Sequence, residues 1–482
     1  MTTEPNAQPS HPRLSLPSLV GFSLPGLPLG ALAVALSVYL PRYYAGHFGV
    51  GLSAVGIAFM AVRLIDMAFD PAIGIVMDRT RTRFGRYRVW LIIGAPILML
   101  AVYMLFLPPT LPHSPVAQYG YLIGWLFLYY IGTSVIGLSH ASWASVIADK
   151  YHERSRVFGA IQVVSIIAAT VVLIVPTLMH STSAAGDVRA MGWFIVIVTP
   201  IGVALAVLRT PEKMVQEVHG ERFGLRDYWE MISRPDMRRI IIADFCLALG
   251  PGWMSAIYLF YFHDSLGFSF NSARFLLAIY IIAGVLGAGV LSWVAMRLGK
   301  HRTLMLASTG YSLGLLSLPF MPKGVFGPAA GIMFALGFLA AAFPLLDRAM
   351  VADVGDAVRL QQGKHRVGLL YAMITSSQKI AGALSIGLTF VVLGWVGYNA
   401  DEHVKNTQAA IHGLELVYLT GPVVFVMLGG ACFIGYKLDQ KRHAEIRAAL
   451  DERDGLVEAP VLDGLTGSQG EHGPYIERAP AE

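Results

Sequence analysis

Twelve long, nearly uncharged apolar runs dominate this sequence of 482 residues. A helix needs about 20 mostly apolar residues to cross the hydrocarbon of a bilayer. Only 14% of the residues are charged and 55% are hydrophobic, whereas a soluble domain carries about a quarter charged residues. The sequence therefore predicts an all-α membrane protein. We place twelve transmembrane helices at 18–41, 53–77, 89–108, 119–148, 157–179, 191–208, 239–262, 275–296, 303–321, 327–352, 367–397 and 414–437.

The longest polar stretch between these helices divides them six and six. It covers residues 209–238, so two six-helix bundles are expected at 18–208 and 239–437. Residues 1–17 form an N-terminal tail, and residues 438–482 form a C-terminal tail that begins as a short amphipathic helix. Basic turns follow the second helix (MDRTRTRFGRYR) and the eighth (MRLGKHR). This weak repeat favours two related, parallel halves.

The basic residues are distributed unequally between the two sides of the membrane. With the N-terminus inside, 28 of the 36 Lys and Arg fall in inside segments and five in outside loops. The positive-inside rule then places both tails in the cytoplasm. These loops account for the pI near 9.1, so no nucleic-acid partner is expected. We expect a monomer that crosses a cell membrane many times and contacts its lipids. The expected location is a bacterial inner membrane.

Ionisable residues inside the apolar runs are the first candidates for function. Each costs roughly 2.5–3.5 kcal/mol at the centre of a membrane helix, so it normally faces a cavity or a partner. Neither cysteine belongs to a metal-ligand cluster, and no motif of a hydrolase or nucleotide-binding enzyme occurs. An enzyme is therefore not expected, nor is a cofactor or a bound metal. The buried ionisable candidates are Arg63, Asp66, Asp70, Asp244, Asp347, Arg348 and Lys379.

Three of these residues recur on one helix face. Arg63, Asp66 and Asp70 stand at positions i, i+3 and i+7, which places them over two turns of the same face. Two carboxylates at this depth can ligate Na⁺ or carry a proton, and the arginine keeps one of them ionised. The alternative is a salt bridge that serves packing alone.

Lys379 lies in the middle of the eleventh apolar run, with no acid within a turn on its own helix. Its partner must therefore come from another helix, and the carboxylates of the first bundle are the obvious candidates. The alternative is a lysine that extends to the membrane surface. That is unattractive because about ten residues separate Lys379 from the nearest turn.

Three segments together resemble the glycoside–pentoside–hexuronide:cation symporters, a branch of the major facilitator superfamily. They read AVRLIDMAFDPAIGIVMDRTRTRFGRYRVWLIIG, SHASWASVIADKYHERSRVFG and MVADVGDAVRLQQGKHRVGLLYAMITSSQKIAGALSIGLTFVVLGWVGY. The resemblance spans roughly residues 20–440 and implies the major facilitator fold around a central cavity. It also implies a site for Na⁺ or H⁺ at Asp66 and Asp70, with Lys379 beside it.

The same resemblance marks residues for gating and Trp143 for the substrate, and the chemistry of neighbouring residues adds further substrate candidates. A latch between the bundles is expected at Asp78, Arg79, Arg154, Arg156, Asp353 and Asp356. An aromatic ring can stack on a sugar, and a histidine can donate a hydrogen bond or carry a proton. Packing between helices is the alternative for the tryptophan, and a structural role is the alternative for Asp347. Candidate substrate residues are Trp143, His140, Gln162, Ser139 and Asp347, with Asp244 as a possible gate.

The chain departs from the sugar carriers of this family in three places. The first helix reads SLPGLPLGALAVAL and has no acid, and Pro25 and Pro28 predict that it is broken. Ser139 and Gln162 stand where the family has an acid and an arginine. We therefore expect cation-coupled symport of a sugar, glycoside or similar small solute. The alternative is an amphipathic, lipid-like substrate such as a lysophospholipid.

Overall fold

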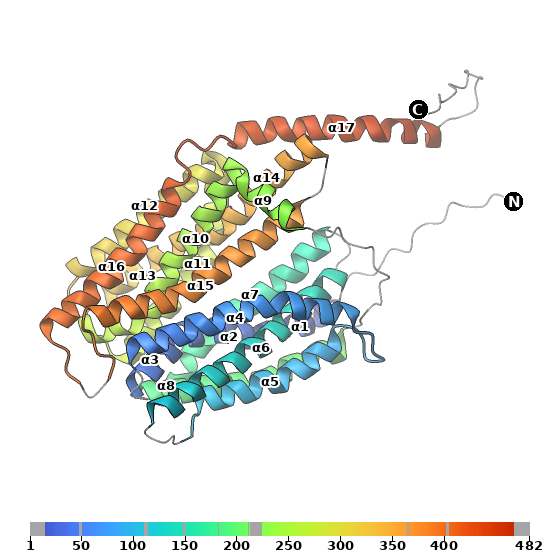
Figure 1. Cartoon of the computed structure of the whole chain (residues 1–482). Helices are drawn as coiled ribbons and strands as arrows, with labels where there is room; N and C mark the ends of the chain where they lie inside the picture. Colours follow the sequence, from blue (N-terminus) through green and yellow to red (C-terminus); the bar gives the residue numbers. More distant parts are fainter. Residues whose placement is uncertain are drawn as a thin grey trace, which may run out of the picture.

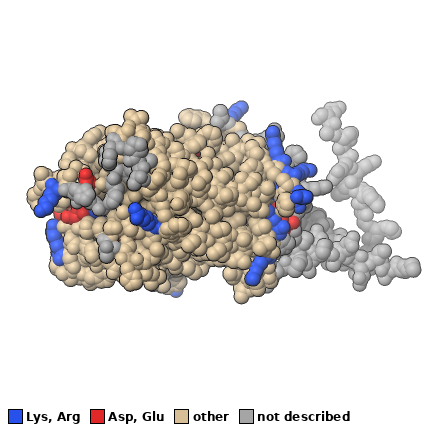
Figure 2. All heavy atoms as spheres, turned by 90° about the horizontal axis from the view of Figure 1, so that it is seen from below, with Lys and Arg blue, Asp and Glu red and all other residues tan. Residues whose placement is uncertain are grey.

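The computed structural model describes residues 15–47, 51–109, 114–147, 151–181, 183–210, 212, 224–363, 366–401 and 404–466. It is built from helices, and twelve of them are long and apolar enough to cross a membrane. Figure 2 shows one face of the molecule, on which charged side chains gather toward the two ends and leave a broad uncharged surface between them. This is the surface expected of a chain whose solvent is lipid.

The first six membrane helices form the N-terminal lobe. The first crossing consists of α1 (Leu16–Ser23), α2 (Gly26–Val34), a π-helical turn at Ala35–Tyr39 and α3 (Leu40–His47). The others are α4 (Leu52–Arg79), α5 (Arg88–Phe106), α6 (Pro115–Ile147), α7 (Tyr151–Leu178) and α8 (Ala184–Arg209).

The second six form the C-terminal lobe. They are α10 (Pro235–Ala256) with a π-helical turn at Phe260–Ser265, α11 (Phe270–Leu298), α12 (Lys300–Ser317) with a 3₁₀ turn at Leu318–Phe320, α13 (Phe326–Ala340) continued by α14 (Ala342–Gln362), α15 (Val367–Trp395) and α16 (Gln408–Ala431). Two further helices lie outside the membrane spans, α9 (Leu225–Ser233) and α17 (Gln440–Thr466).

The predicted break in the first helix is present at Pro25. Helix α1 ends at Ser23 and α2 begins at Gly26. Proline lacks a backbone N–H and its ring crowds the preceding turn, so the helix cannot run through it unchanged. Pro28 lies within α2, whose first turn tolerates it.

Two segments differ from the sequence expectation. The polar stretch 209–238 contains α9, where Asp227 accepts a hydrogen bond from the Gly224 backbone N–H at 2.8 Å and so caps the helix. Helix α17 extends to Thr466, beyond the short tail helix expected at 438–453. Both helices are amphipathic or polar, and a search for apolar runs passes over such segments.

The lobes meet most closely at one end of the molecule. We call the end at which α1 begins and α17 lies the tail end, and the opposite one the far end (Figure 1). Near the far end, Gly56 of α4 packs so closely on α15 that a Cβ would lie 2.6 Å from the Cβ of Phe390. Toward the tail end the two helices diverge in Figure 1, and Phe69, Ile75 and Val76 of α4 are exposed.

Candidate cation and solute site

Helices α4 and α15 carry the residues of the predicted cation site. They pack against each other along the boundary between the lobes. Arg63, Asp66 and Asp70 lie on α4, and Lys379 lies on α15. Four ionisable residues from two lobes thus meet within the membrane-spanning part of the protein.

Asp66 is the buried centre of the α4 group, and its side chain has no exposed surface. Its Oδ2 lies 3.0 Å from Nη1 of Arg63, and its Oδ1 accepts a hydrogen bond of 3.0 Å from the Ser134 hydroxyl of α6. The Arg63 guanidinium also lies over the Tyr130 ring, 4.8 Å from its centroid. Both Asp66 oxygens therefore have a partner within the N-terminal lobe.

Asp70 is held differently, by a residue of the other lobe. Its Oδ2 forms an ion pair with Nζ of Lys379. Its Oδ1 is buried and has no hydrogen-bond partner among the described residues. Oxygen ligands with negative charge suit a hard cation such as Na⁺, and Asp70 offers one unused oxygen and one that the lysine can release.

A second group of buried carboxyl groups lies in the C-terminal lobe. Asp244 of α10 and Asp347 of α14 are 2% and 1% exposed and line a cavity of about 330 Å³. Gln378 of α15 donates a hydrogen bond of 2.8 Å to Asp244 Oδ1. Asp244 Oδ2 and Asp347 Oδ1 have no hydrogen-bond partner in the described part of the chain. The rings of Tyr280 and Phe343 also line this cavity.

The other predicted substrate residues are mostly engaged in packing. Trp143 is fully buried against Phe22, with ring centroids 5.1 Å apart. His140 Nε2 lies 2.7 Å from the Phe22 carbonyl oxygen. The Ser139 hydroxyl donates to the Val135 carbonyl of its own helix at 2.7 Å, and Gln162 is exposed on α7. In this conformation, none of these four lines the cavity that contains Asp347.

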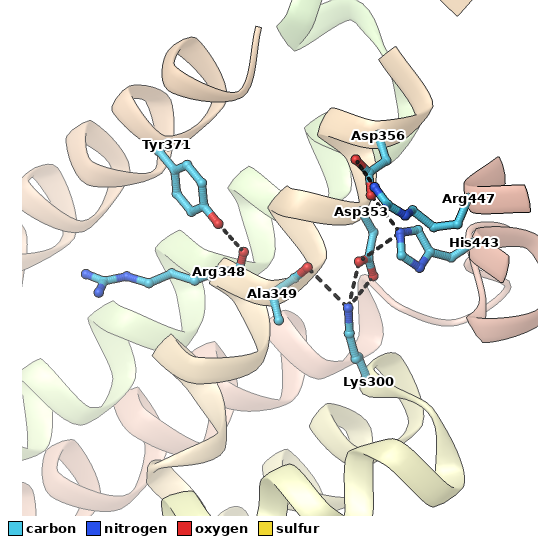
Figure 3. Close-up of polar contacts among 8 residues, drawn as sticks. All are labelled: Lys300, Arg348, Ala349, Asp353, Asp356, Tyr371, His443 and Arg447. Atoms are coloured by element: carbon cyan, nitrogen blue, oxygen red, sulfur yellow. Dashed lines mark hydrogen bonds and ion pairs between the residues drawn. The ribbon is translucent and has the colours of Figure 1, made fainter. Parts of the chain in front are cut away.

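The predicted gating residues of the C-terminal lobe bind helix α17. In Figure 3, Asp353 accepts from Nζ of Lys300 at 2.6 and 2.7 Å, and His443 of α17 lies 3.4 Å from it. Asp356 lies 3.1 Å from His443 and 3.5 Å from Arg447. These contacts fix the tail helix to α14.

The predicted gating residues of the N-terminal lobe are described only in part. The side chains of Asp78 and Arg154 lie outside the described residues. Arg79 is exposed at the end of α4, and Arg156 lies 3.7 Å from Glu153 within α7. A latch between the lobes at this end stays a prediction.

A family model described as MFS/sugar transport protein matches residues 21–440 of the chain. The chain belongs to this family. It is a major facilitator of the glycoside–pentoside–hexuronide:cation symporter branch, a transporter and not an enzyme.

Three curated relatives match nearly the whole transporter. The isoprimeverose transporter of Lactiplantibacillus pentosus is 24% identical, over 87% of this chain and 90% of its own. The glucuronide carrier protein homolog of Escherichia coli strain K12 is 23% identical, over 94% and 99%. The sodium-dependent lysophosphatidylcholine symporter 1-B of Danio rerio is 19% identical, over 92% and 90%.

Solved structures share the fold. A bacterial homologue of the human lysosomal transporter Spinster, in an inward-facing and unoccupied conformation, superimposes with a TM-score of 0.62. The two are 12% identical, over 87% of this transporter and 97% of that chain. This likeness confirms the predicted two-lobe major facilitator fold.

Two ion pairs that join the lobes of the transporter at the far end were not predicted. Arg42 of α3 lies 3.2 Å from Asp264, and Arg274 of α11 forms an ion pair with Asp187 of α8. Of these four residues, Arg42, Asp187 and Arg274 are buried and Asp264 is partly exposed. By the predicted helix bounds, Arg42 and Arg274 fall in outside loops, and Asp187 precedes the sixth helix at 191–208. Ion-pair partners in different lobes leave no spacing signal in the sequence.

Glu212 at the tail end was also missed. Its carboxylate accepts hydrogen bonds from the backbone N–H groups of Arg86 and Tyr87, both at 2.7 Å, and of Arg88 at 3.2 Å. These groups lie at the N-terminus of α5, where unpaired N–H groups and the helix dipole favour a negative charge. The basic loop after α4 is therefore anchored to the segment after α8.

Proposed function

We propose that the transporter moves a sugar, glycoside or similar small organic solute together with Na⁺ or H⁺, by alternating access. The observation that carries this proposal is the ion pair between Lys379 and Asp70, which joins the two lobes inside the membrane beside the buried Asp66. A cation that binds the two carboxylates displaces the lysine. Cation binding therefore changes how the lobes are held together.

The next residue along α15 links this site to the second one. Lys379 contacts Asp70 in the N-terminal lobe, while Gln378 contacts Asp244 in the cavity of its own lobe. A shift of α15 that releases Lys379 also moves Gln378. This supports an affinity linkage, in which the cation and the solute favour the same conformations of the carrier.

The distribution of basic residues supports cytoplasmic tails, in a bacterial inner membrane. The far end is then the outer side of the transporter. The ion pairs Arg42–Asp264 and Arg274–Asp187 close that side, and the divergence of α4 and α15 toward the tails gives an inward-facing state. The latch predicted at the tail end would form in the opposite, outward-facing state.

The decisive experiment is uptake by the purified transporter in vesicles. An inward Na⁺ or H⁺ gradient should drive uptake of a solute from a panel of glycosides above its equilibrium level, and collapse of the gradient should release it. Uptake that only equilibrates the solute under every gradient would contradict coupling. A cysteine placed in 209–238 should label from the cytoplasmic side alone.

A lipid-like substrate is the second candidate. It is supported by the similarity to the lysophosphatidylcholine symporter and by the neutral residues Ser139 and Gln162 at positions where sugar carriers are charged. A thermal-shift comparison of glycosides with lysophospholipids, with and without Na⁺, separates the two. Stabilisation by lysolipids alone would favour this candidate.

A further inference from the structure

The two lobes balance their buried charges in different ways. In the N-terminal lobe, Asp66 and Asp70 are matched by two cations, Arg63 and Lys379. In the C-terminal lobe, Asp244 and Asp347 face an amide and a cavity. Neither forms an ion pair with a cation among the described residues.

The nearest basic residue in sequence forms no direct contact with this second pair. Arg348 follows Asp347 on α14, but neighbouring helical residues point about 100° apart. Its side chain is exposed and forms no ion pair with either aspartate within the described chain, so its charge acts on Asp244 only from a distance. Figure 3 shows it extending away from the Asp353 cluster as well. A buried carboxylate without a positive partner is strongly disfavoured.

The cavity beside the two aspartates has the size of a ligand site. Its volume of about 330 Å³ exceeds the needs of a bare ion and lies within the range of small-molecule sites, roughly 300–1,000 Å³. Two buried carboxylate oxygens that line it lack a hydrogen-bond donor, and two aromatic rings form part of its wall. Aromatic faces attract ammonium groups.

We propose that the transported solute carries a protonated amine, which binds Asp244 and Asp347 in this cavity of the C-terminal lobe. This rests on the proposed transport function and specifies its substrate class. A hydroxyl group could satisfy the two free oxygens, but it supplies no positive charge to an ionised carboxylate. An ammonium supplies the hydrogen-bond donors and one positive charge together, which suits a carboxyl pair that carries one negative charge. Solute binding at Asp244 then shifts Gln378, and with it the neighbouring Lys379 on the same helix.

Binding of matched solutes to the purified full chain tests the inference. The pairs are glucosamine with glucose, ethanolamine with ethylene glycol, and phenethylamine with phenylethanol, with N-acetylglucosamine as a neutral analogue of the amine. In at least one pair the amine should bind on the order of a hundredfold more tightly than its hydroxyl partner, because removing one member of a buried charge pair has effects of this size. Equal binding, or no amine binding, in all three pairs overturns the inference.

Variants locate the amine. Asp347→Asn and Asp244→Asn should each abolish the amine preference, whereas Asp439→Asn at the tail end should leave it unchanged. Gln378→Lys places an ammonium of the chain itself beside Asp244, so it should abolish amine binding without loss of melting temperature. An amine preference that survives in all three cavity variants would refute the site even if one variant folds poorly.

The inference and the transport function can fail separately. If Na⁺ or H⁺ binding still raises the melting temperature of Asp347→Asn through Asp66 and Asp70, the cation site works without the amine site. If gradients never drive uptake but amines bind with the stated preference, the coupling proposal fails and the assignment of the cavity stands.

Discussion

The lobes are joined by ion pairs of two kinds, one at the centre of the membrane and one at the far end. At the far end we compare the Arg274–Asp187 ion pair, called the far-end pair below. Its side chains are 3% and 1% exposed. At the centre, the Lys379 and Asp70 side chains are 24% and 13% exposed. The far-end pair is supported by Asn271, which accepts hydrogen bonds from Arg274 at 3.2 Å and from Thr177 of the other lobe at 2.8 Å.

This difference separates a structural closure from an exchangeable contact. A fully buried pair is costly to break one member at a time. A partly exposed pair is weakened by water and can trade its lysine for another cation. The central pair therefore fits a binding site, and the far-end pair fits a gate that opens as a unit.

The largest effect should come from the central carboxylates. We expect Asp66→Asn and Asp70→Asn each to abolish gradient-driven uptake while the protein still reaches the membrane, because the cation loses a charged ligand. Uptake in vesicles under an imposed gradient measures this. Asp439→Asn, at the start of α17 and outside the membrane-spanning helices, is the control for loss of an aspartate charge. Accumulation of solute against a gradient by either variant would remove the cation site from α4.

The far-end pair should show the largest effect on stability. Asp187→Asn leaves the Arg274 charge buried without its partner, which costs roughly 3–5 kcal/mol. Combining Asp187→Leu with Arg274→Met should recover most of this loss. Melting of the single and double variants gives the coupling energy.

The same variants should open the far end. In a Cys246→Ser, Cys432→Ser background, Thr177→Cys should react faster with a membrane-impermeant thiol reagent once Asp187 is replaced. Unchanged labelling together with additive stability effects would show that this pair does not close the far end.

The central pair should give a smaller coupling energy but a larger loss of transport. We expect Lys379→Ala and Asp70→Asn to couple by about 1 kcal/mol, since both side chains are partly exposed. Lys379→Ala alone should impair concentrative uptake, and adding Asp70→Asn should restore some stability without restoring uptake. Strictly additive melting temperatures with normal transport in Lys379→Ala would require a site redrawn without the lysine.

The four ionisable residues of the central site could be predicted from the sequence, because each lies inside an apolar run. Arg63, Asp66 and Asp70 share a helix face by local spacing alone. Lys379 had no acid on its own helix, so a partner in another helix was required, and the structure shows that the partner is Asp70. Charged residues inside apolar runs are rare enough to stand out. The helical period then shows which of them lie on the same face of one helix.

The far-end gate and the C-terminal-lobe cavity could not be predicted in the same way. Asp187 and Arg274 lie near the starts of their helices, where charged residues are common, and the predicted starts of these two helices were late by seven and five residues. Gln378 is neutral, so its place in an apolar run gives no signal, and its role rests on the hydrogen bond to Asp244. Both features depend on how helices distant in sequence pack together, between the lobes at the far end and within the C-terminal lobe at the cavity, which local sequence patterns do not specify.

A smaller loss of stability than that of the buried Arg274–Asp187 pair should come from Tyr398, which supports the second far-end contact. Its hydroxyl donates a hydrogen bond of 2.5 Å to Asp264, the partner of Arg42. Tyr398→Phe should lower the free energy of unfolding by about 1.5 kcal/mol, because a donor to a charged acceptor is lost. The matched control is Tyr436→Phe, since the buried Tyr436 hydroxyl has no partner among the described residues. Its removal should be nearly neutral.

The pH dependence of this effect sharpens the test. Burial, and then the negative charge of Asp264, raise the pKa of Tyr398 above its ordinary value. A raised pKa keeps the donor protonated, so its contribution is fully present below the ordinary pKa, near 10, and is lost only as the pH rises through the higher folded-state pKa. The stability difference between wild type and Tyr398→Phe should thus stay constant from about pH 6 to 9. A difference that disappears within this range would mean that Tyr398 ionises in the folded protein and repels Asp264, so the far-end contact would rest on Arg42 alone.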